Sequence, residues 1–115
     1  MTQRVQLDFQ EKAFQCVLNQ VRAGHSSLDG LASQFAMHRR TLNRHLLACG
    51  TNFRQMENKA RHEIACELLS DTPRNADAIA AELGYSSASA FSRAFSKWEG
   101  LPPATWRKLA STSSS

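Results

Sequence analysis

Apolar residues recur every three or four positions along most of the chain, which is the spacing that buries one face of a helix. Within this pattern, one arrangement of apolar and basic positions occurs twice. The first copy, over residues 28–50, is marked by Leu31, Ala32, Leu42, Arg44 and Leu46. The second copy, over residues 76–100, is marked by Ile79, Ala80, Phe91, Arg93 and Phe95. Each copy predicts a short helix, a tight turn and a second helix with arginine on its outer side, and a repeat of this length is typical of a tandem helix-turn-helix.

The same periodicity predicts an all-α fold of about seven helices, because no segment alternates with the period of two that marks a strand. We expect two helix-turn-helix lobes, at about 28–49 and 76–99, joined by a long central helix at about 53–70 in a homeodomain-like arrangement. A helix over about 8–23 precedes the lobes, and a short final helix begins at Pro103.

The expected domain covers residues 8–110, with residues 1–7 as an arm or linker end and the serine-rich residues 111–115 as a disordered tail. Helix ends are marked by Ser and Asn, which cap the first N–H groups, and by Gly, which stops a helix. The expected N-caps are Ser27, Asn52 (with Gln55 as a variant capping box), Asn75 and Ser86, and the expected stops are Gly24, Gly50, Gly84 and Gly100. Gly30 lies inside a predicted helix at a cost of ~1 kcal/mol relative to alanine, so packing must compensate.

Positive charge is concentrated in the middle of the chain. The net charge is +4 and the isoelectric point is about 9.3, and ten of the fourteen basic residues are arginine. Between residues 39 and 61, six cations face the single anion Glu57; they are Arg39, Arg40, Arg44, Arg54, Lys59 and Arg61. Such an excess is expected of a surface that binds phosphate, although a solvated basic surface would give the same count.

The second helix of each copy separates an inner apolar side from an outer polar side. With Leu42 and Leu46 inward, at about 100° per residue, the outer residues of the first copy are Arg40, Asn43 and Arg44, with Leu47 between them and Arg39 near the edge. With Phe91, Phe95 and Trp98 inward, those of the second copy are Ser89, Ser92, Arg93, Ser96 and Lys97, with Ala88 towards the N-terminal end. Such faces fit the major groove of DNA, where arginine binds guanine, asparagine binds adenine and alanine contacts a thymine methyl. We expect the first helix to discriminate bases and the second mainly to anchor through Arg93 and Lys97.

At these residues the chain resembles the DNA-binding domain of the AraC/XylS family of bacterial transcription regulators, over roughly residues 14–108. The matching positions in the second half are Ile79, Ala80, Gly84, Tyr85, Ser86, Ser89, Phe91, Arg93, Phe95, Gly100, Pro103, Trp106 and Arg107. Those in the first half are Leu31, Ala32, Leu42, Arg44 and Gly50, followed by Arg61, Ala65, Leu68 and Leu69 on the long helix. The resemblance implies two recognition helices in successive major grooves. The residues that it places at the DNA are Arg39, Arg40, Asn43 and Arg44 of the first copy, and Ala88, Ser89, Ser92 and Arg93 of the second.

Four positions depart from the family pattern. His38 stands where a serine-like cap is usual, so the first recognition helix is expected to begin less firmly, while its imidazole can add a pH-dependent phosphate contact. Ala36 replaces a frequent glycine, Pro102 a frequent serine or threonine, and Trp106 a frequent tyrosine. None of these changes removes an expected DNA contact.

The resemblance also implies partners. Double-stranded DNA is the expected ligand, and regulators of this family also contact RNA polymerase. Most members carry an effector-sensing or dimerising domain N-terminal to this one, and we expect such a domain outside this chain in preference to a stand-alone regulator. The alternative interpretation is a helical protein-interaction module, for example one that contacts RNA polymerase, without specific DNA binding of its own. A salt titration separates the two, because phosphate binding weakens linearly in log affinity against log salt.

Other chemistry finds little support. No acid, base or nucleophile groups converge, so we expect no enzyme. Two pairs, His45 with Cys49 and His62 with Cys66, each place two types of zinc ligand one helical turn apart. However, the four side chains need not converge, their spacing matches no known finger, and cysteine often fills gaps in a core. We therefore expect no metal and no cofactor.

The sequence also indicates a compartment. No apolar stretch approaches the ~20 residues that span a bilayer, and the N-terminus does not resemble a signal peptide. The three cysteines, Cys16, Cys49 and Cys66, are odd in number and form no CxxC pair, which indicates a reducing cytoplasm. We expect a cytoplasmic protein with no membrane partner.

Overall fold

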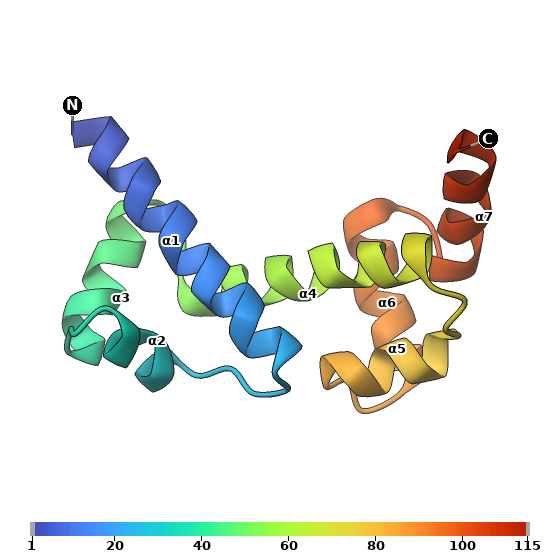
Figure 1. Cartoon of the computed structure of the whole chain (residues 1–115), viewed down its shortest axis with the longest axis horizontal. Helices are drawn as coiled ribbons and strands as arrows, with labels where there is room; N and C mark the ends of the chain where they lie inside the picture. The colour runs from blue at the N-terminus through green and yellow to red at the C-terminus, as the bar shows by residue number, and fades with distance from the viewer. Residues whose placement is uncertain (1, 115) are drawn as a thin grey trace. The chain divides into compact units, whose positions relative to one another are not determined.

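The computed structural model describes the backbone of residues 2–114 and the side chains of residues 8–110. This part of the chain contains seven α-helices and no strand (Figure 1), which confirms the all-α prediction. The helices are α1 (Thr2–Arg22), α2 (Leu28–Gln34), α3 (Arg39–Ala48), α4 (Phe53–Asp71), α5 (Ala76–Leu83), α6 (Ala88–Glu99) and α7 (Pro103–Ser114). Among the described residues, no helix is both long enough and apolar enough to cross a membrane.

The backbone divides into two compact units, residues 1–61 and residues 62–115, which we call the N-terminal unit and the C-terminal unit. Helix α4 runs through the boundary between them. The first predicted helix-turn-helix, α2 with α3, lies in the N-terminal unit, and the second, α5 with α6, lies in the C-terminal unit. Each copy of the sequence repeat therefore belongs to a unit of its own.

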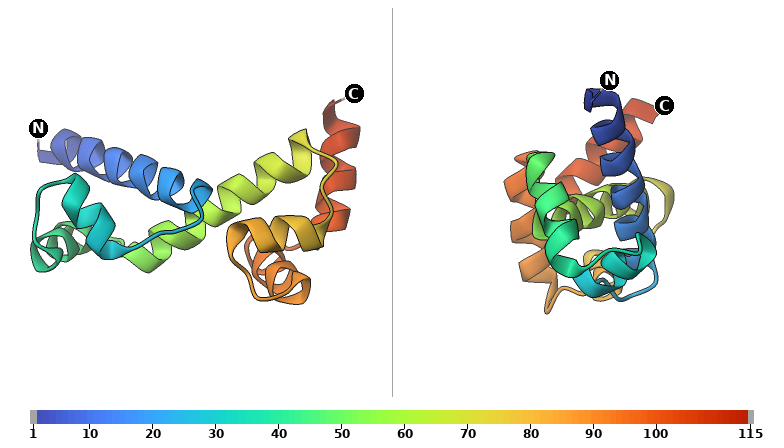
Figure 2. Two further views of the ribbon diagram at one scale, coloured as in Figure 1. Left: turned by 60° about the horizontal axis from the view of Figure 1, so that its bottom comes forward. Right: turned by 90° about the vertical axis from the view of Figure 1, so that its left-hand side faces the viewer.

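The core of the N-terminal unit is formed by the apolar sides of its four helical segments. Helix α1 packs against α2, and α2 packs against α3 (Figure 2). The ring of Phe9 adds tilted contacts to Phe35 and His45, with centroids 5.1 and 5.4 Å apart. The buried residues of this unit are Ala13, Val17, Leu18, Val21, Leu31, Ala32, Leu42, Leu46, Met56 and Ala60. Their spacing of three and four positions is the one that the sequence pattern predicted.

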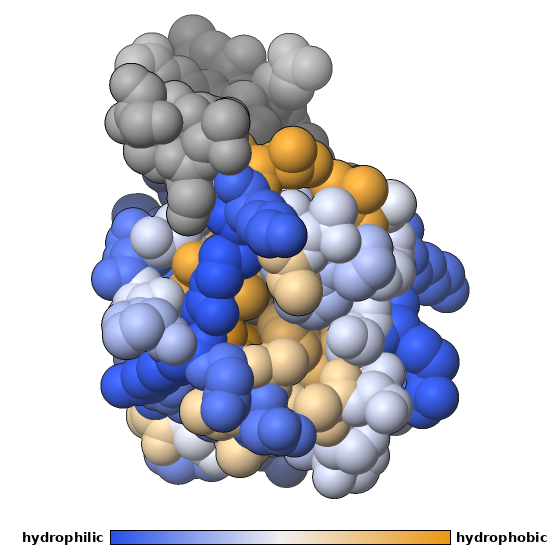
Figure 3. Space-filling view, turned by 90° about the vertical axis from the view of Figure 1, so that its right-hand side faces the viewer, coloured by the Kyte–Doolittle hydropathy of each residue, from blue (hydrophilic) through white to orange (hydrophobic). Residues whose placement is uncertain are grey.

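The C-terminal unit is built around aromatic residues of α6. Phe91 and Phe95 are completely buried, and the ring of Phe95 meets that of Trp106 from α7 with centroids 5.7 Å apart. Helix α6 packs against both α5 and α7. The remaining buried apolar residues before α6 are Ile64, Ala65, Leu69, Ile79, Ala80 and Leu83. In Figure 3, hydrophilic residues lie along both sides of the face that is shown, and hydrophobic residues lie between them.

Side-chain hydrogen bonds cap several helices as predicted. Ser27 Oγ accepts from the N–H of Gly30 at 2.9 Å, Asn52 Oδ1 from that of Gln55 at 2.9 Å, and Asn75 Oδ1 from that of Ala78 at 2.9 Å. Only half of the capping box forms at Asn52, because the side chain of Gln55 accepts a bond from Thr51 Oγ1. The structure also explains Gly30: a β carbon there would lie 2.9 Å from Ser27 Oγ and 3.1 Å from Gln20 Nε2.

The helix α6 ends at Gly100 as predicted, but its N-cap and the orientation of Trp98 correct the sequence prediction. The N-cap is Ser87, whose Oγ accepts from the N–H of Ala90 at 3.1 Å, and not Ser86. Two adjacent serines are equally good caps, so the burial of Phe91 and Phe95 decides where the helix begins. Trp98 was predicted to point inward but is 38 % exposed. Its ring packs edge-on against His62, with centroids 4.8 Å apart, because the last turn of α6 lies against α4 at the margin of the core.

The turns of the two copies share one backbone geometry. After α2, the N–H of Met37 donates to the carbonyl of Ala32 at 2.9 Å, and after α5 the N–H of Tyr85 donates to that of Ala80 at 2.9 Å. The left-handed position is Ala36, with φ of 53°, in the first turn and Gly84, with φ of 85°, in the second. The glycine that Ala36 replaces would therefore suit this backbone better.

The outermost helices are longer than the sequence predicts. Helix α1 begins at Thr2 and not near residue 8, and α7 continues to Ser114, through residues predicted to be a disordered tail. Neither proline nor glycine interrupts residues 2–7 or 104–114, so no residue there forces a break. Met1 and Ser115, the ends of the predicted arm and tail, lie outside the described residues.

Candidate nucleic-acid interface

Helix α3 presents the predicted donor side chains to solvent. Leu42 and Leu46 are completely buried and fix which side of the helix faces the core. The residues on the opposite side, Arg39, Arg40, Asn43 and Arg44, are all exposed. In the described part of the chain, no hydrogen bond or ion pair engages the side chains of Arg40, Asn43 or Arg44. Their long donors are therefore available to a ligand.

Arg39 differs from its neighbours because it faces a carboxylate. Its Nε lies 3.6 Å from Asp29 Oδ1, in the first turn of α2. The side chains are 67 % and 75 % exposed, so this pair contributes little to stability and is readily exchanged for another anion. Sequence spacing did not show this contact, since the two residues belong to different helices.

An open hollow lies at the start of α3. It has a volume of about 730 Å³ and is lined by Leu28, His38, Arg39, Arg40, Thr41 and Asn43. His38 occupies the N-cap position but its side chain makes no capping hydrogen bond, as the sequence predicted. The hollow is thus bordered by cationic side chains.

Helix α6 presents a shorter and less charged surface. Phe91 and Phe95 face the core, while Ser89, Arg93 and Lys97 are exposed. Ala88 and Ser92 are half-buried, so they can meet only a ligand that approaches closely. Arg93 and Lys97 lie one helical turn apart, which places two cations on the same side of the helix.

Leu47 is a surface residue that the candidate list from the sequence omitted. It is 61 % exposed and follows Asn43 by four residues and Arg44 by three, so it shares their side of α3. The helical projection already placed it between the polar residues. Its apolar side chain could contact a thymine methyl within the same surface.

Other basic residues have structural partners, so the charge count of the sequence overstates the interface. The guanidinium of Arg61 lies 3.4 Å from Glu57 and is largely buried. The Nζ of Lys59 stands 5.1 Å from the centre of the Phe14 ring. Arg74 pairs with Glu82, and Arg107 donates to backbone carbonyls near the end of α4. Within residues 8–110, cations share a helix face with other predicted contacts on α3 and on α6.

Comparison with known proteins gives three findings. A family model described as a helix-turn-helix domain matches residues 31–109. An uncharacterized helix-turn-helix-type transcriptional regulator of Mycobacterium tuberculosis is 36% identical over 78 residues, which are 68% of this chain and 23% of that protein. The chain spans 23–28% of the length of the curated relatives that it matches.

Solved structures share the fold. A transcriptional regulator from Chromobacterium violaceum, described as having an AraC-type DNA-binding domain, superposes with a TM-score of 0.77 at 23% identity, over 85% of this chain and 88% of that one. The DNA-binding domain of AdpA, a global transcriptional factor solved in complex with a target DNA, gives a TM-score of 0.70 at 24% identity, over 86% of this chain and 89% of that one.

Proposed function

Because the chain belongs to the AraC-type helix-turn-helix family of transcription regulators, whose domain binds double-stranded DNA sequence-specifically, we propose that α3 and α6 are its two recognition helices. Each enters a major groove, and the two grooves are successive ones of the same duplex. The family is one of regulators and not of enzymes. The observation that carries the proposal is the outer side of α3, where Arg40, Asn43 and Arg44 are exposed and unpaired within the described residues.

Helix α3 discriminates bases in this proposal. Arg40 and Arg44 can each bind the O6 and N7 atoms of guanine with two hydrogen bonds, and Asn43 can do the same for adenine. Arg39 binds a phosphate of the DNA backbone. Its weak contact to Asp29 is replaced by a shorter, charge-assisted hydrogen bond to the phosphate oxygen. The hollow at the start of the helix gives the DNA backbone room to approach.

Helix α6 mainly anchors the complex. Arg93 and Lys97 neutralise phosphates, and Ser89 and Ser92 contact phosphates or bases where the DNA comes close. Ala88, at the N-terminal end of the helix, can contact a thymine methyl. Short side chains specify fewer bases than the forked donors of α3, so the half of the operator that α6 contacts should tolerate more sequences.

Binding measurements on purified protein test this assignment. Arg40→Ala and Arg44→Ala should each weaken binding to a selected operator by about 1–3 kcal/mol, the worth of one bidentate base contact, and should relax discrimination at one position. Lys59→Ala is the matched control, because this cation lies over the Phe14 ring on another helix, and it should change binding little. Equal effects of all three variants would contradict the proposal.

The dependence on salt tests the role of α6. Arg93→Ala and Lys97→Ala should weaken binding to all sequences about equally, and each should reduce the slope of log affinity against log salt by about 1. Greater losses from base changes in the α6 half of the operator than in the α3 half would reverse the assignment. A flat response to salt in the unmodified protein would favour the alternative, a module that binds only proteins.

Three further proposals concern the whole protein. We propose that an effector-sensing or dimerising domain lies outside this chain, that DNA-bound protein contacts RNA polymerase, and that it works in the cytoplasm. The support is the greater length of the relatives and the behaviour of the family. Co-purification of RNA polymerase with the protein on operator DNA, but not on unrelated DNA, would support the second part.

A further inference from the structure

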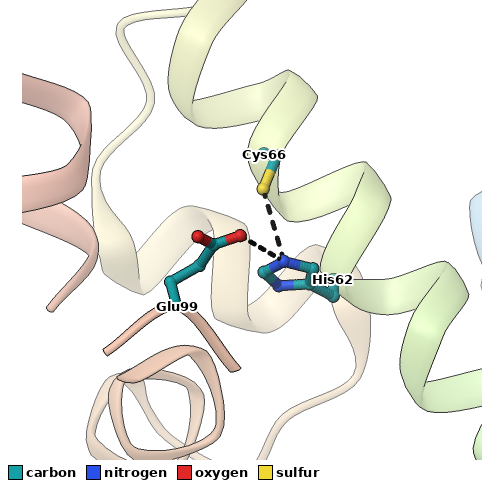
Figure 4. Close-up of side chains that lie close together, drawn as sticks. All are labelled: His62, Cys66 and Glu99. Carbon is teal, nitrogen blue, oxygen red and sulfur yellow. Dashed lines mark hydrogen bonds and ion pairs between the residues drawn. The ribbon is translucent and has the colours of Figure 1, made fainter. Parts of the chain in front are cut away.

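Three side chains of the C-terminal unit converge near its surface. His62 and Cys66 lie one turn apart on α4, and Glu99 is the last residue of α6 (Figure 4). His62 Nε2 lies 2.7 Å from Glu99 Oε1 and 3.8 Å from Cys66 Sγ. One potential ligand atom from each residue lies within 4.8 Å of the other two.

The Nε2 atom of His62 meets two neighbours of different character. In the plane of the ring, Nε2 carries either one proton or one lone pair. If it donates to the carboxylate of Glu99, it has no lone pair left to accept a bond from the Cys66 thiol. If it accepts from the thiol, it faces the carboxylate lone pairs without a proton. Without a metal the first arrangement can stand, with the sulfur as a weak acceptor. A cation placed between the three atoms would take all three as ligands.

We propose that His62, Cys66 and Glu99 form a binding site for a divalent transition-metal ion of the zinc type. Imidazole nitrogen, thiolate sulfur and carboxylate oxygen are the ligands that Zn²⁺ takes, whereas Mg²⁺ and Ca²⁺ prefer oxygen alone. With ligand distances of about 2.0–2.3 Å, tetrahedral ligand atoms stand about 3.3–3.8 Å apart. The separation of Cys66 Sγ and His62 Nε2, 3.8 Å, lies at the upper end of this range. The carboxylate of Glu99 would have to turn, so that its oxygen moves away from His62 Nε2, now 2.7 Å distant, and comes nearer to Cys66 Sγ, which lies within 4.8 Å.

The surroundings suit a surface ion with three protein ligands. The side chains of His62 and Glu99 are 21 % and 32 % exposed, so water can reach the site and supply a fourth ligand. The ring of His62 is held between Phe95 and Trp98, with centroids 5.3 and 4.8 Å away. Its Nδ1 is buried without a hydrogen-bond partner. In most metal-binding histidines a hydrogen bond from the second nitrogen orients the ring, whereas here the packing of the aromatic rings does so.

The thiol must lose its proton when the ion binds. Burial, together with the nearby carboxylates of Glu99 and Glu63, raises the pKa of Cys66 to about 11, so the metal-free thiol is neutral. The ion brings the positive charge that would stabilise the thiolate, and the proton leaves to solvent. The bound ion would then link the middle of α4 to the end of α6.

The first half of the chain supplies a matched control. His45 and Cys49 on α3 repeat the His-x-x-x-Cys spacing, but no carboxylate joins them in a cluster within the described residues. His45 instead packs on the ring of Phe9. If spacing alone sufficed, both pairs would bind metal. The proposal predicts that only the second pair does.

Titration of the metal-free, reduced 115-residue chain with Co²⁺ tests this. We expect one equivalent to bind with an absorption band from sulfur-to-cobalt charge transfer, and Zn²⁺ to displace it. Cys66→Ser should abolish the band and weaken Zn²⁺ binding at least about tenfold, whereas Cys49→Ser should change neither. Absence of the band, or its loss in Cys49→Ser but not in Cys66→Ser, would overturn the proposal.

A second variant covers the case in which Cys66→Ser does not fold. Glu99→Gln removes only one charge at the surface, so its helical circular dichroism should be unchanged. It should bind Zn²⁺ at least about tenfold more weakly than the unmodified chain. In the unmodified chain, saturating Zn²⁺ should raise the melting temperature, because the ion binds only the folded state. Unchanged affinity in Glu99→Gln would contradict the site.

Discussion

Ala36 carries a β carbon in the left-handed conformation that its counterpart Gly84 adopts without one. Their φ angles are 53° and 85°, and the hydrogen bonds of the two turns are alike. For a residue other than glycine, this conformation costs roughly 1–2 kcal/mol. The structure thus places a strained residue immediately before the helix that carries most of the predicted base contacts.

Substituting glycine for Ala36 and alanine for Gly84 should have opposite effects on stability. Ala36→Gly should raise the free energy of unfolding by up to about 1 kcal/mol, since relief of strain exceeds the added entropy of the unfolded glycine. Gly84→Ala should lower it by about 1 kcal/mol or more. A β carbon at Gly84 would meet no atom within 4 Å, so the loss comes from the backbone alone. Urea unfolding measures both changes, and a destabilising Ala36→Gly would contradict this explanation.

At the scale of helices, Arg107 joins α7 to the end of α4. Its Nε donates to the carbonyl of Leu69 at 2.9 Å, and its Nη2 donates to that of Thr72 at 3.1 Å. The last carbonyls of a helix lack partners within the helix. The planar guanidinium of Arg107 holds its donors at fixed directions toward the carbonyl of Leu69 and that of Thr72 just beyond the helix, whereas a lysine would offer one ammonium on a flexible stem.

Loss of this contact should destabilise the C-terminal unit. Arg107→Ala should lower the free energy of unfolding by about 1.5–3 kcal/mol, the worth of hydrogen bonds to a charged group, and Arg107→Lys should recover only part. Arg54→Ala removes an exposed arginine from the other end of α4 and serves as the control. Thermal unfolding followed by circular dichroism compares the three. Equal stability of Arg107→Ala and Arg54→Ala would show that the contact is dispensable.

The helices and their inner sides were predictable because they depend on local spacing. Leu42 and Leu46, or Phe91 and Phe95, lie four residues apart, so each pair defines one side of its helix and the opposite side follows. The prediction that Trp98 points inward was wrong, because spacing along a helix cannot show where the core ends. The prediction of Ser86 as the N-cap was wrong, because two adjacent serines can cap a helix equally well and packing decides which of them does so.

At the scale of the molecule, contacts between distant residues were beyond prediction. Glu99 follows His62 by 37 residues, so no spacing rule links them. Asp29 and Arg39 belong to different helices, and the turn between these helices brings their side chains together. Arg61 and Arg107 add to the positive charge of the sequence. However, the guanidinium of Arg61 pairs with Glu57, and that of Arg107 donates to a carbonyl near the end of α4. The candidate DNA contacts on α3 and α6 rest on exposure and family, and they stay predictions.

The presence of two lobes also predicts the form of the operator. Selection of bound sequences from a random duplex pool should return two half-elements about 10 base pairs apart, since each recognition helix would occupy one of two successive major grooves. Insertion of about five base pairs would turn one half-element to the opposite face of the duplex and should cost at least about 1–3 kcal/mol in binding. A gel-shift assay on both duplexes measures this. Equal affinity would mean that one lobe alone engages specifically.

The uncapped beginning of α3 has a consequence for binding. Ser87 accepts a hydrogen bond from a backbone N–H at the start of α6, whereas the side chain of His38 makes no such bond at the start of α3. The N-terminus of a helix attracts anions through its first N–H groups and through its dipole. Once α3 enters a groove as proposed, a phosphate oxygen of the duplex can take the place of the missing hydroxyl. The nucleic acid would then complete the helix that reads it, and part of the affinity would be the free energy of ordering that first turn.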